Sequence, residues 1–437
     1  MFKPTAFLTW ALFLTLGTSA FAQLPASPGA EGFGSIATGG RGGDVYYVTN
    51  RNSSGAGSFA YGVQNAPAAG RTIVFAVSGH IRLPSGSGGG LSIAKSKVTV
   101  AGQTAPGDGI CFWNNTMNIT GNDTVIRNIR WRYGKQAAGG DSVDIANSQR
   151  IILDHCDVMF STDENLSSFG TPPEFFTFQW SVNAWGLNSH SCGGLWDINH
   201  ATAHHTLWAN NHTRNPKCIS PSVFDWVNNV TFGWDNGFNM AASTDPIARV
   251  NIRGSYFIHG GNTTEAVYGG GLNTLGENIF KLHMSDSALD GTANGILDSN
   301  RTNYGMVNSS QYDQVATAWP QTVDGITGGA VIGTPVTGDL FSFIVTDTDS
   351  GGQHCYQFDE DISHDGGINT SGQNAYHLDS QLRAHGHPFC ITVAAEYSEL
   401  LRDENAGHQR AVITPVVGVR SRREVLLVDD FAAQIAV

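Results

Sequence analysis

The sequence predicts an all-β fold, a parallel β-solenoid, and three observations support this prediction. Short runs rich in Val, Ile, Phe and Trp recur at nearly even intervals through the middle of the chain. The stretches between them lack the long 3.6-residue apolar period of an amphipathic helix. Charged residues make up 14% of the 437 residues and glycines number 53, whereas average chains hold about 25% charged residues and about 7% glycine. Such a composition favours many turns and few exposed helices.

The N-terminus has the pattern of a signal peptide. Lys3 precedes an apolar run that ends on Ala20-Phe21-Ala22, the small-x-small pattern that signal peptidase cleaves. We therefore expect residues 1–22 to be a signal peptide and the protein to be secreted and extracellular. No later run approaches the roughly 20 apolar residues that cross a bilayer, so no association with a membrane is expected.

A glycine-rich segment, "PGAEGFGSIATGGRGG", follows the expected cleavage site. Its "GFGSIA" matches the dinucleotide fingerprint with Ala in last place, but that fingerprint needs a strand before it and a helix after it. Here a strand-like stretch, "DVYYVTN", comes next. We interpret the segment as a glycine-rich loop that leads into the first coil.

The β-rich runs define a repeat. They start 21 to 29 residues apart, and a period of this size with strands and no helices is typical of a solenoid, in which each coil buries its apolar side chains against its neighbours. An antiparallel sandwich would show two-residue hairpin turns and shorter spacings, so the solenoid is favoured. Asn128, Asn211 and Asn229 are expected at tight corners, where Asn tolerates a left-handed backbone. The runs are "VTVAGQ" from Val98, "TVIRNIRW" from Thr124, "RIILDHCDV" from Arg150, "FFTFQWSV" from Phe175, "HHTLWANNH" from His204, "DWVNNVTFG" from Asp225 and "ARVNIRGSYF" from Ala248.

Acidic residues gather near the ends of successive coils and suggest a calcium site. Calcium takes six to eight oxygen ligands in flexible geometry, which neighbouring coils could supply. The alternative is that these residues cap turns and remain solvated. The candidates are Asp141, Asp144, Asp154, Asp157, Asp163 and Glu164.

The stretch "HHTLWANNHTRNPK" has two explanations. In the first, His204 or His205 faces the core or its rim and Arg214 pairs with a carboxylate. In the second, Arg214 and Lys217 form a local basic patch and Arg214 takes part in chemistry. The chain has a formal net charge of −13, which argues against nucleic acids and anionic membranes as partners. An acidic substrate would need such a patch or a bound cation, but composition alone favours the first explanation.

Six ordered motifs resemble a known family over about residues 28 to 310. The chain is similar to the secreted pectate lyases of polysaccharide lyase family 1, and most of all to the pectate lyase C group. The resemblance implies a right-handed parallel β-helix that cleaves polygalacturonate (pectate) by β-elimination, with Ca²⁺ as cofactor, in the degradation of pectin in plant cell walls. The products would be 4,5-unsaturated oligogalacturonides. The motifs are "PGAEGFGSIATGGRGG", "RTIVFAVSGHIRL", "VAGQTAPGDGI", "STDENLS", "HSCGGL" and "HHTLWANNHTRNPK".

The resemblance also assigns roles to the basic residues. Arg214 matches the arginine that takes the proton from C5 of the sugar, although a guanidinium normally stays protonated in proteins. The family's second arginine is Ile219 here, and Lys217 is the nearest cation. His190 aligns roughly with a lysine that binds substrate, so Lys217 and His190 are the expected substrate-binding residues.

The calcium ligands that the resemblance implies are incomplete. Asp141 and Asp163 fall at acidic ligand positions of the family. Ser167 stands where a further acidic residue is expected, and we expect Glu164 to compensate for it. The predicted metal ligands are therefore Asp141, Asp163 and Glu164.

The C-terminal part of the chain shares neither the period nor the likeness. We expect a β-helix catalytic domain over residues 23–315 and a divergent segment over 316–437. The segment either caps the solenoid, since solenoids need their open end covered, or reflects a frame or splice error. Six cysteines have no zinc-binding spacing, and in an oxidising compartment one or two disulfides are expected among them, with the pairing left open.

Other functions remain open besides a monomeric pectate lyase. One is a pectin lyase that acts on methylated pectin. Another is a non-catalytic protein that binds polyuronates, in keeping with Ser167. The third is an inverting hydrolase, which needs two carboxylates about 6.5 to 9.5 Å apart and could draw them from Asp141, Asp154 and Asp163.

Overall fold

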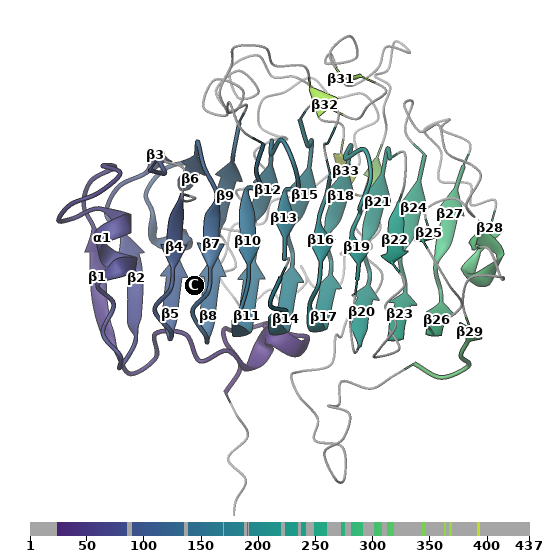
Figure 1. Cartoon of the computed structure of the whole chain (residues 1–437), viewed down its shortest axis with the longest axis horizontal. Helices are drawn as coiled ribbons and strands as arrows, with labels where there is room; N and C mark the ends of the chain where they lie inside the picture. Colours follow the sequence, from purple (N-terminus) through teal and green to yellow (C-terminus); the bar gives the residue numbers. More distant parts are fainter. Residues whose placement is uncertain are drawn as a thin grey trace, which may run out of the picture.

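The chain forms a parallel β-solenoid in the computed structural model (Figure 1). The structure describes residues 24–84, 90–134, 139–168, 170–187, 190, 192–219, 223–234, 237–241, 249–259, 272–275, 281–291, 301–307 and 313–318, with four short strands beyond them. The expected signal peptide (1–22) lies outside these residues, as does nearly all of the segment 316–437. In the described part of the chain, no helix is long and apolar enough to cross a membrane.

Two long sheets form two faces of the solenoid. The first sheet has eleven strands, in the order β1 (Asp44–Val48), β2 (Arg71–Phe75), β5 (Val98–Ala101), β8 (Thr124–Arg127), β11 (Gln149–Asp154), β14 (Glu174–Gln179), β17 (Asn199–His204), β20 (Phe224–Val227), β23 (Arg249–Arg253), β26 (Lys281–Ser285) and β29 (Asp313–Gln314). The second sheet has ten, in the order β3 (Gly79–Arg82), β6 (Ile110–Trp113), β9 (Ile129–Arg132), β12 (Asp157–Met159), β15 (Val182–Ala184), β18 (Leu207–Ala209), β21 (Val230–Phe232), β24 (Tyr256–Ile258), β27 (Ala288–Asp290) and β28 (Arg301–Thr302).

A third face consists of two shorter sheets in line. One holds β4 (Leu91–Ile93), β7 (Met117–Ile119), β10 (Val143–Ile145) and β13 (Leu166–Ser167), and the other holds β16 (Leu195–Trp196), β19 (Lys217–Cys218), β22 (Phe238–Ala241) and β25 (Leu272–Leu275). An isolated parallel bridge between Ser168 and Trp196 continues one sheet into the other. In the later part of the chain, β30 (Phe343–Val345) pairs with β33 (Ile391–Val393), and β31 (Ile362–Ser363) pairs with β32 (Gly367–Ile368).

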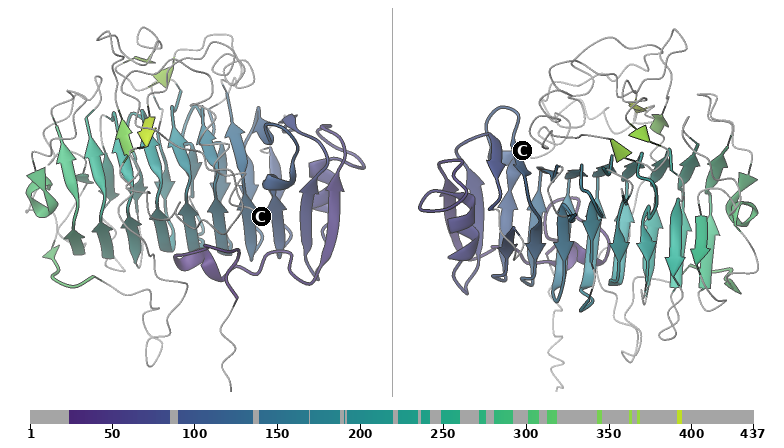
Figure 2. Two further views of the ribbon diagram at one scale, coloured as in Figure 1. Left: turned by 180° about the vertical axis from the view of Figure 1, so that it is seen from behind. Right: turned by 45° about the horizontal axis from the view of Figure 1, so that its top comes forward.

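The predicted repeat is confirmed. Each run from Thr124 onward contains a corner, with the end of one strand in the first sheet and the start of the next in the second sheet, as β8 and β9 show on either side of Asn128. All pairings between neighbouring coils are parallel in the described part except the last, β27 with β28, so the antiparallel sandwich is excluded. Figure 2 shows the same stack of coils from behind and from above.

The corners use a left-handed backbone, but not always at asparagine. Asn128 has φ 55°, as expected, whereas the next two predicted corners fall one residue earlier, at Asn210 (φ 53°) and Asn228 (φ 55°). Asn211 and Asn229 are instead buried. Asn229 Oδ1 accepts hydrogen bonds from the backbone N–H and the hydroxyl of Thr206, so it ties one coil to the previous one.

Stacked apolar side chains fill the interior. Register in the first sheet aligns one inward residue from each of nine successive coils, and all of these residues are buried. Ala203 has the smallest side chain in this row. The ring of Trp208 packs near it, with its centroid 6.1 Å from that of Phe178 and 5.6 Å from that of Trp226. A large ring thus fills the space beside the small side chain of Ala203, as native packing density requires. The row is Ile73, Val100, Ile126, Leu153, Phe178, Ala203, Trp226, Ile252 and Met284.

Short helices cover the two ends of the coil stack. At the N-terminal end, α1 (Phe59–Gln64) is capped by Ser58, whose Oγ accepts the N–H of Tyr61, and Phe59 packs 4.5 Å from the ring of Phe112. At the other end, the 3₁₀ helix η3 (Asn303–Met306) buries Met306, and the hydroxyl of Tyr304 donates to the carbonyl of Leu282. A further 3₁₀ turn, η2 (Gly102–Thr104), follows β5.

The glycine-rich segment lies across the outside of the first sheet, as the purple ribbon at the lower edge of Figure 1 shows. Its 3₁₀ turn η1 (Phe33–Ile36) is held by backbone N–H groups of Phe33 and Gly34, which donate to the hydroxyls of Thr202 and Thr177. A side chain at Gly34 would meet the carbonyl oxygen of Ile151 at 2.1 Å. The segment's 3₁₀ turn leads into β1 and not into an α-helix, so the interpretation as a loop is confirmed and the dinucleotide fingerprint is excluded.

Candidate active site

The residues predicted to act together do meet, on the third face of the solenoid. Parallel bridges pair Glu164 with Cys192, and Cys192 with Thr213. Three successive coils are therefore in register here, and the residues next to this row come together although they are far apart in sequence. The resulting cluster contains Asp141, Asp163, Glu164, His190, Cys192 and Arg214, and we call it the carboxylate–arginine cluster.

Three carboxylates form the acidic half of the cluster. One oxygen from each of Asp141, Asp163 and Glu164 lies within 4.8 Å of the others. Asp141 Oδ1 accepts the backbone N–H of Glu164 at 2.9 Å. Asp163 Oδ1 is buried and accepts no well-oriented hydrogen bond from the described residues, while Nδ1 of His190 lies 3.0 Å from it. An oxygen in this position is short of a partner.

Burial and the nearness of other acidic groups raise the pKa values of two of the three carboxyls. Burial raises the pKa of Asp141 to about 7, and the charge of Asp163 adds to this effect. Burial also raises the pKa of Glu164 to about 9, helped by the hydrogen bond with Asp163 and the charge of Asp141 and opposed by Arg214. A cation among the three oxygens would favour the ionised forms. Clustered carboxylate oxygens are also the donors that calcium prefers, so the residues fit this ion.

Ser167 takes no part in the cluster. Its hydroxyl donates to the carbonyl of Leu195, and the residue is buried in β13. Its neighbour across the strands is Asp144 in β10. Burial raises the pKa of Asp144 to about 6, and Asp144 is close enough to Asp141 for its charge to raise the pKa of that carboxyl.

Arg214 pairs with a carboxylate of the cluster. Its Nη1 contacts Oε1 of Glu164, and its backbone N–H donates to Asn239 Oδ1 at 3.0 Å. Burial by itself lowers the pKa of the guanidinium, but interactions with Cys192, Glu164 and Asp163 raise it by more, so the net pKa is above its ordinary value. The first explanation of this stretch, a paired arginine, thus describes the geometry, and the partner belongs to the predicted metal ligands.

Lys217 and His190 lie on two sides of the cluster. Lys217 opens β19, where burial and then the charge of Arg214 lower the pKa of its ammonium group. His190 is half-exposed, with 54% of its side chain accessible, above Asp163. Lys217 thus lies beside Arg214 and His190 beside Asp163, and His190 is open to solvent.

A buried network of asparagine side chains supports the cluster. No pattern in the sequence predicted these hydrogen bonds. Asn165, which follows Glu164, donates to Asn183 Oδ1 and Asn211 Oδ1, both at 3.0 Å. Asn211 in turn donates to Oδ1 of Asn215, which follows Arg214, at 3.0 Å. The network therefore links the backbones that carry Glu164 and Arg214. The available signal was an Asn directly after each of these residues.

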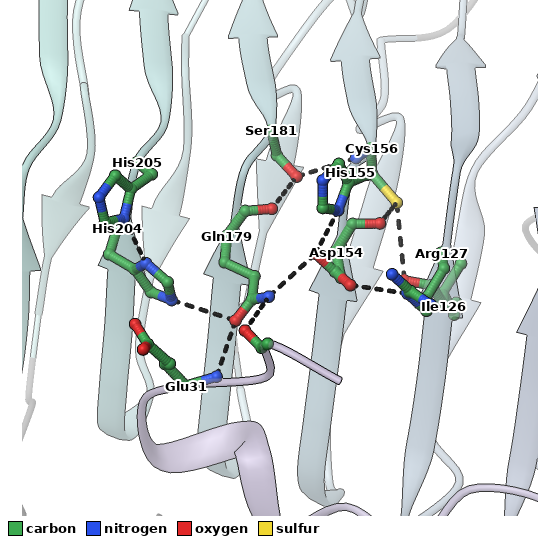
Figure 3. Close-up of polar contacts among 11 residues, drawn as sticks. Glu31, Ile126, Arg127, Asp154, His155, Cys156, Gln179, Ser181, His204 and His205 are labelled. Carbon is green, nitrogen blue, oxygen red and sulfur yellow. Dashed lines mark hydrogen bonds and ion pairs between the residues drawn. The ribbon is translucent and has the colours of Figure 1, made fainter. Parts of the chain in front are cut away.

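Asp154 lies elsewhere, in a separate network on the first sheet (Figure 3). Its carboxylate is fully buried and contacts Arg127 Nε at 2.7 Å, His155 Nδ1 at 2.6 Å and Gln179 Nε2 at 2.9 Å. Burial would raise the pKa of Asp154, but His155 and Arg127 lower it to about 2. A carboxylate that is enclosed in this way cannot serve as one of the two exposed groups of an inverting hydrolase. Asp154 is therefore removed from that hypothesis.

His204 and His205 belong to the same network. Gln179 Nε2 donates to Asp154 and to the carbonyl of Gly29, so its Oε1 must be the acceptor for His204 Nε2 at 3.1 Å. The other nitrogen of His204 then accepts from His205 Nδ1 at 2.8 Å, in keeping with a neutral His204 ring, whose pKa burial lowers. Both histidines are buried, as expected, and His204 supports Gln179, whose side chain binds the N-terminal segment at Glu31 and Gly29.

The cysteines within the described residues are thiols. Cys111, Cys156, Cys192 and Cys218 are buried and form no disulfide there. The expectation of two disulfides is therefore wrong, and a single disulfide could join only the other two cysteines. Cys355 and Cys390 lie outside the described residues.

Known proteins are similar in sequence to this chain over about two thirds of its length. A probable pectate lyase C of Aspergillus flavus is 38% identical over 306 residues, which cover 68% of this chain and 69% of that protein. A probable pectate lyase C of Neosartorya fischeri is 38% identical over 317 residues, which cover 70% and 73%. No family model matches the chain.

Solved structures are similar at lower levels. The major cedar pollen allergen Jun a 1 has a TM-score of 0.48 and 16% identity, and the alignment covers 64% of this chain and 88% of the allergen. A thermostable pectate lyase has a TM-score of 0.49 and 13% identity, with 67% and 91% covered.

Proposed function

This chain belongs to the pectate lyases, and from that premise we propose that it cleaves polygalacturonate by β-elimination at the carboxylate–arginine cluster. The products are 4,5-unsaturated oligogalacturonides, and the setting is pectin degradation in plant cell walls by a secreted monomer. The observation that carries the assignment of the site is the contact between Arg214 and Glu164 beside two further carboxylates. A base and a cation site are thereby brought within reach of one sugar.

The reaction sets the requirements that the residues must meet. A base removes the proton on C5 of a galacturonate, the electron pair forms the C4–C5 double bond, and the bond from C4 to the glycosidic oxygen breaks. Negative charge develops next to the uronate carboxylate, and preorganised positive charge lowers the barrier. Calcium, when bound, supplies charge neutralisation of this kind and acidifies the C5 proton.

Asp141, Asp163 and Glu164 are the residues that would hold calcium. They offer oxygen donors only, and Asp163 Oδ1 is the one that accepts no well-oriented hydrogen bond from the described residues. Asp144, opposite Ser167, is the nearest substitute for the missing acidic ligand. The free carboxylates of polygalacturonate suit a cation site better than methyl esters do, which favours a pectate lyase over a pectin lyase.

Arg214 can act as the base only if its contact with Glu164 loosens. The negative groups around it raise the pKa of the guanidinium, whereas a base must lose its proton. Release of Glu164 from Arg214 would remove one of the interactions that keep the proton in place. We therefore assign to Glu164 a second role, in which it controls the protonation of Arg214.

Lys217 and His190 are proposed to bind the uronate carboxylates of the substrate. The chain has a formal net charge of −13 and would repel a polyanion without local cations. Lys217 adjoins Arg214, and the exposed ring of His190 stands above Asp163. Together with Arg214 they form the basic patch that the substrate needs.

The test is the ultraviolet absorbance of unsaturated products. Polygalacturonate is incubated with the secreted protein, with added calcium or with a chelator, and Arg214→Lys is compared with Arg150→Lys. Arg150 pairs with Asp123 on the first sheet, so it is a matched control away from the cluster. We expect calcium-dependent absorbance that Arg214→Lys abolishes, because lysine lacks the planar fork of arginine, and that Arg150→Lys retains.

The alternatives give different results. Activity that the chelator does not change would remove the calcium part of the proposal. Near wild-type activity of Arg214→Lys would overturn the role of Arg214. Binding of polygalacturonate without any product would identify a non-catalytic polyuronate-binding protein, which the incorporation of Ser167 into β13 favours.

A further inference from the structure

A thiol faces the carboxylate–arginine cluster, and no step of the proposed reaction uses it. Cys192 is the parallel bridge partner of Glu164 in the next coil. Side chains of bridge partners in parallel register point to the same side of a sheet, so the sulfur lies beside the Glu164 carboxylate. One atom each from Glu164, His190 and Cys192 lies within 4.8 Å of the others.

The surroundings of Cys192 differ from those of the other buried thiols. Cys218 lies in the hydrophobic core of the solenoid, and burial alone raises the pKa of its thiol. Cys156 Sγ contacts the carbonyls of Ile126 and Asp154. Cys192 is as deeply buried, but within the described residues its sulfur has neither a disulfide nor a hydrogen-bond partner, and it is not part of the core cluster. Its neighbours are instead the charged groups Arg214, Glu164 and Asp163.

We propose that Cys192, His190 and Glu164 form a binding site for a thiophilic transition metal ion of the zinc class. Thiolate, imidazole and carboxylate are the ligands that zinc takes in proteins, whereas calcium takes oxygen alone. The sequence spacing matches no zinc pattern because the three ligands come from two coils and meet only through the register of the fold. Asp163, whose Oδ1 lies 3.0 Å from His190 Nδ1, is the available fourth ligand.

The geometry requires a small adjustment. Zinc binds sulfur at about 2.3 Å and nitrogen or oxygen at about 2.0–2.2 Å, so tetrahedral donors stand roughly 3.3–3.8 Å apart. The donors here lie up to 4.8 Å apart. His190 is half-exposed and can turn toward the sulfur, and the ion can approach between His190 and Asp163, the accessible members of the cluster.

Charge and protons balance in this site. Binding forms a metal–sulfur bond and releases the thiol proton to solvent, together with the proton of Glu164 where that carboxyl is protonated. The thiolate and the Glu164 carboxylate then neutralise the divalent ion, and the charge of Asp163 is balanced by Arg214. Glu164 must leave Arg214 in order to bind the ion. The site therefore shares Glu164 and Asp163 with the proposed calcium site, and the two ions exclude each other. This competition, which rests on the proposed function, makes zinc an inhibitor of the lyase.

Cobalt chloride provides a test that does not depend on activity, because a thiolate bound to cobalt gives a charge-transfer absorption in the near ultraviolet. The full-length secreted protein is stripped with a chelator, kept reduced and titrated with cobalt alone. We expect one equivalent to produce the band, zinc to remove it, and Cys192→Ser to lose it. Cys218→Ser, which changes a buried thiol of the core, should retain it. His190→Ala, a change at a half-exposed side chain, should weaken cobalt binding at least tenfold.

The result that overturns the site is a wild-type protein without the band, or a band of equal strength in Cys192→Ser. If Cys192→Ser does not fold, unchanged cobalt affinity in His190→Ala overturns it equally. For inhibition, we expect zinc to act competitively with calcium and to be at least tenfold less potent on Cys192→Ser. A cobalt band in a protein that shows no lyase activity would refute the proposed function and leave the metal site in place.

Discussion

Nη1 of Arg214 contacts Oε1 of Glu164 across two coils of the solenoid. The contact joins the predicted base to a predicted metal ligand, so a cation bound to Glu164 changes the electrostatic environment of Arg214. Burial gives this relationship its strength, because water screens a partly buried pair much less than a surface pair.

Glu164→Gln should weaken calcium binding about tenfold or more. The substitution removes one of the three carboxylates that share the proposed ion and leaves a neutral side chain of the same shape, and loss of a partner in a metal site commonly has effects of this size. Calorimetric titration with calcium is the measurement. Glu174→Gln, at a partly exposed carboxylate in the first sheet, is the control and should bind calcium like the wild type. Equal affinity in Glu164→Gln would show that this carboxylate is not a ligand.

Calcium affinity should rise with pH between about 6 and 9. The pKa values of Asp141 and Glu164 are raised to about 7 and about 9 without an ion, so below these values protons compete with the metal. Each group that must lose a proton adds up to about a tenfold gain in affinity per pH unit. Titrations at pH 6, 7, 8 and 9 measure the slope. A flat profile would mean that the two carboxyls are already ionised in the empty site.

The same pKa values predict how the metal-free protein responds to pH. Both carboxyls have folded-state pKa values above those of the unfolded chain, so the folded state binds more protons between the two values and loses stability as pH rises through this window. We expect the melting temperature without calcium to fall from pH 5 to pH 9 and calcium to restore it. A melting temperature that rises over this range in chelator would contradict the assignment.

The sequence predicted the coils because their signal is local. Each run from Thr124 to Ala248 contains the apolar strands that a coil needs, and Asn128 marks a corner as an asparagine should. Other corners have no such signal. Trp180 and His205 take φ values of 50° and 51°, and their rings stack at 4.2 Å. A contact between coils stabilises the left-handed backbone there, and single-residue preferences do not include such a contact.

The site forms through the register between neighbouring coils, and this register cannot be read from the sequence. Glu164 and Arg214 are 50 residues apart, and only the bridges through Cys192 bring them together. The family likeness suggested the carboxylates and the arginine, but neither the ion pair nor the thiol beside it. Asp154 is the opposite case. In the sequence it lies near the end of a coil like the other acidic residues, but its side chain belongs to a different network on another sheet.

Asp154→Asn should destabilise the protein by about 3 kcal/mol, because it leaves Arg127 with a neutral partner in a buried site. The pKa of Asp154 is lowered to about 2, so its contribution is present above the unfolded value near 4 and is lost as pH falls toward 2. Denaturant unfolding at pH 7 and pH 3 should therefore show a smaller difference at pH 3. Asp44→Asn, in an exposed pair with Arg71, should cost no more than about 1 kcal/mol. Activity per folded molecule should persist in Asp154→Asn. Loss of that activity would mean that Asp154 takes part in catalysis.

Gly34→Ala tests whether the N-terminal segment is part of the folded unit. A Cβ at this position would meet the carbonyl oxygen of Ile151 at 2.1 Å and the backbone nitrogen of Thr177 at 2.6 Å. Neither backbone atom can move away without disturbing the first sheet, so η1 must lift from it and lose the hydrogen bonds to Thr177 and Thr202. We expect a loss of about 2 kcal/mol or more, in line with other severe steric changes in packed regions, measured as a lower melting temperature. Gly305→Ala, where a Cβ meets nothing within 4 Å, is the matched control and should leave the melting temperature nearly unchanged. If both variants melt like the wild type, the segment is dispensable for stability, and the buried histidines beneath it have a role other than to hold it in place.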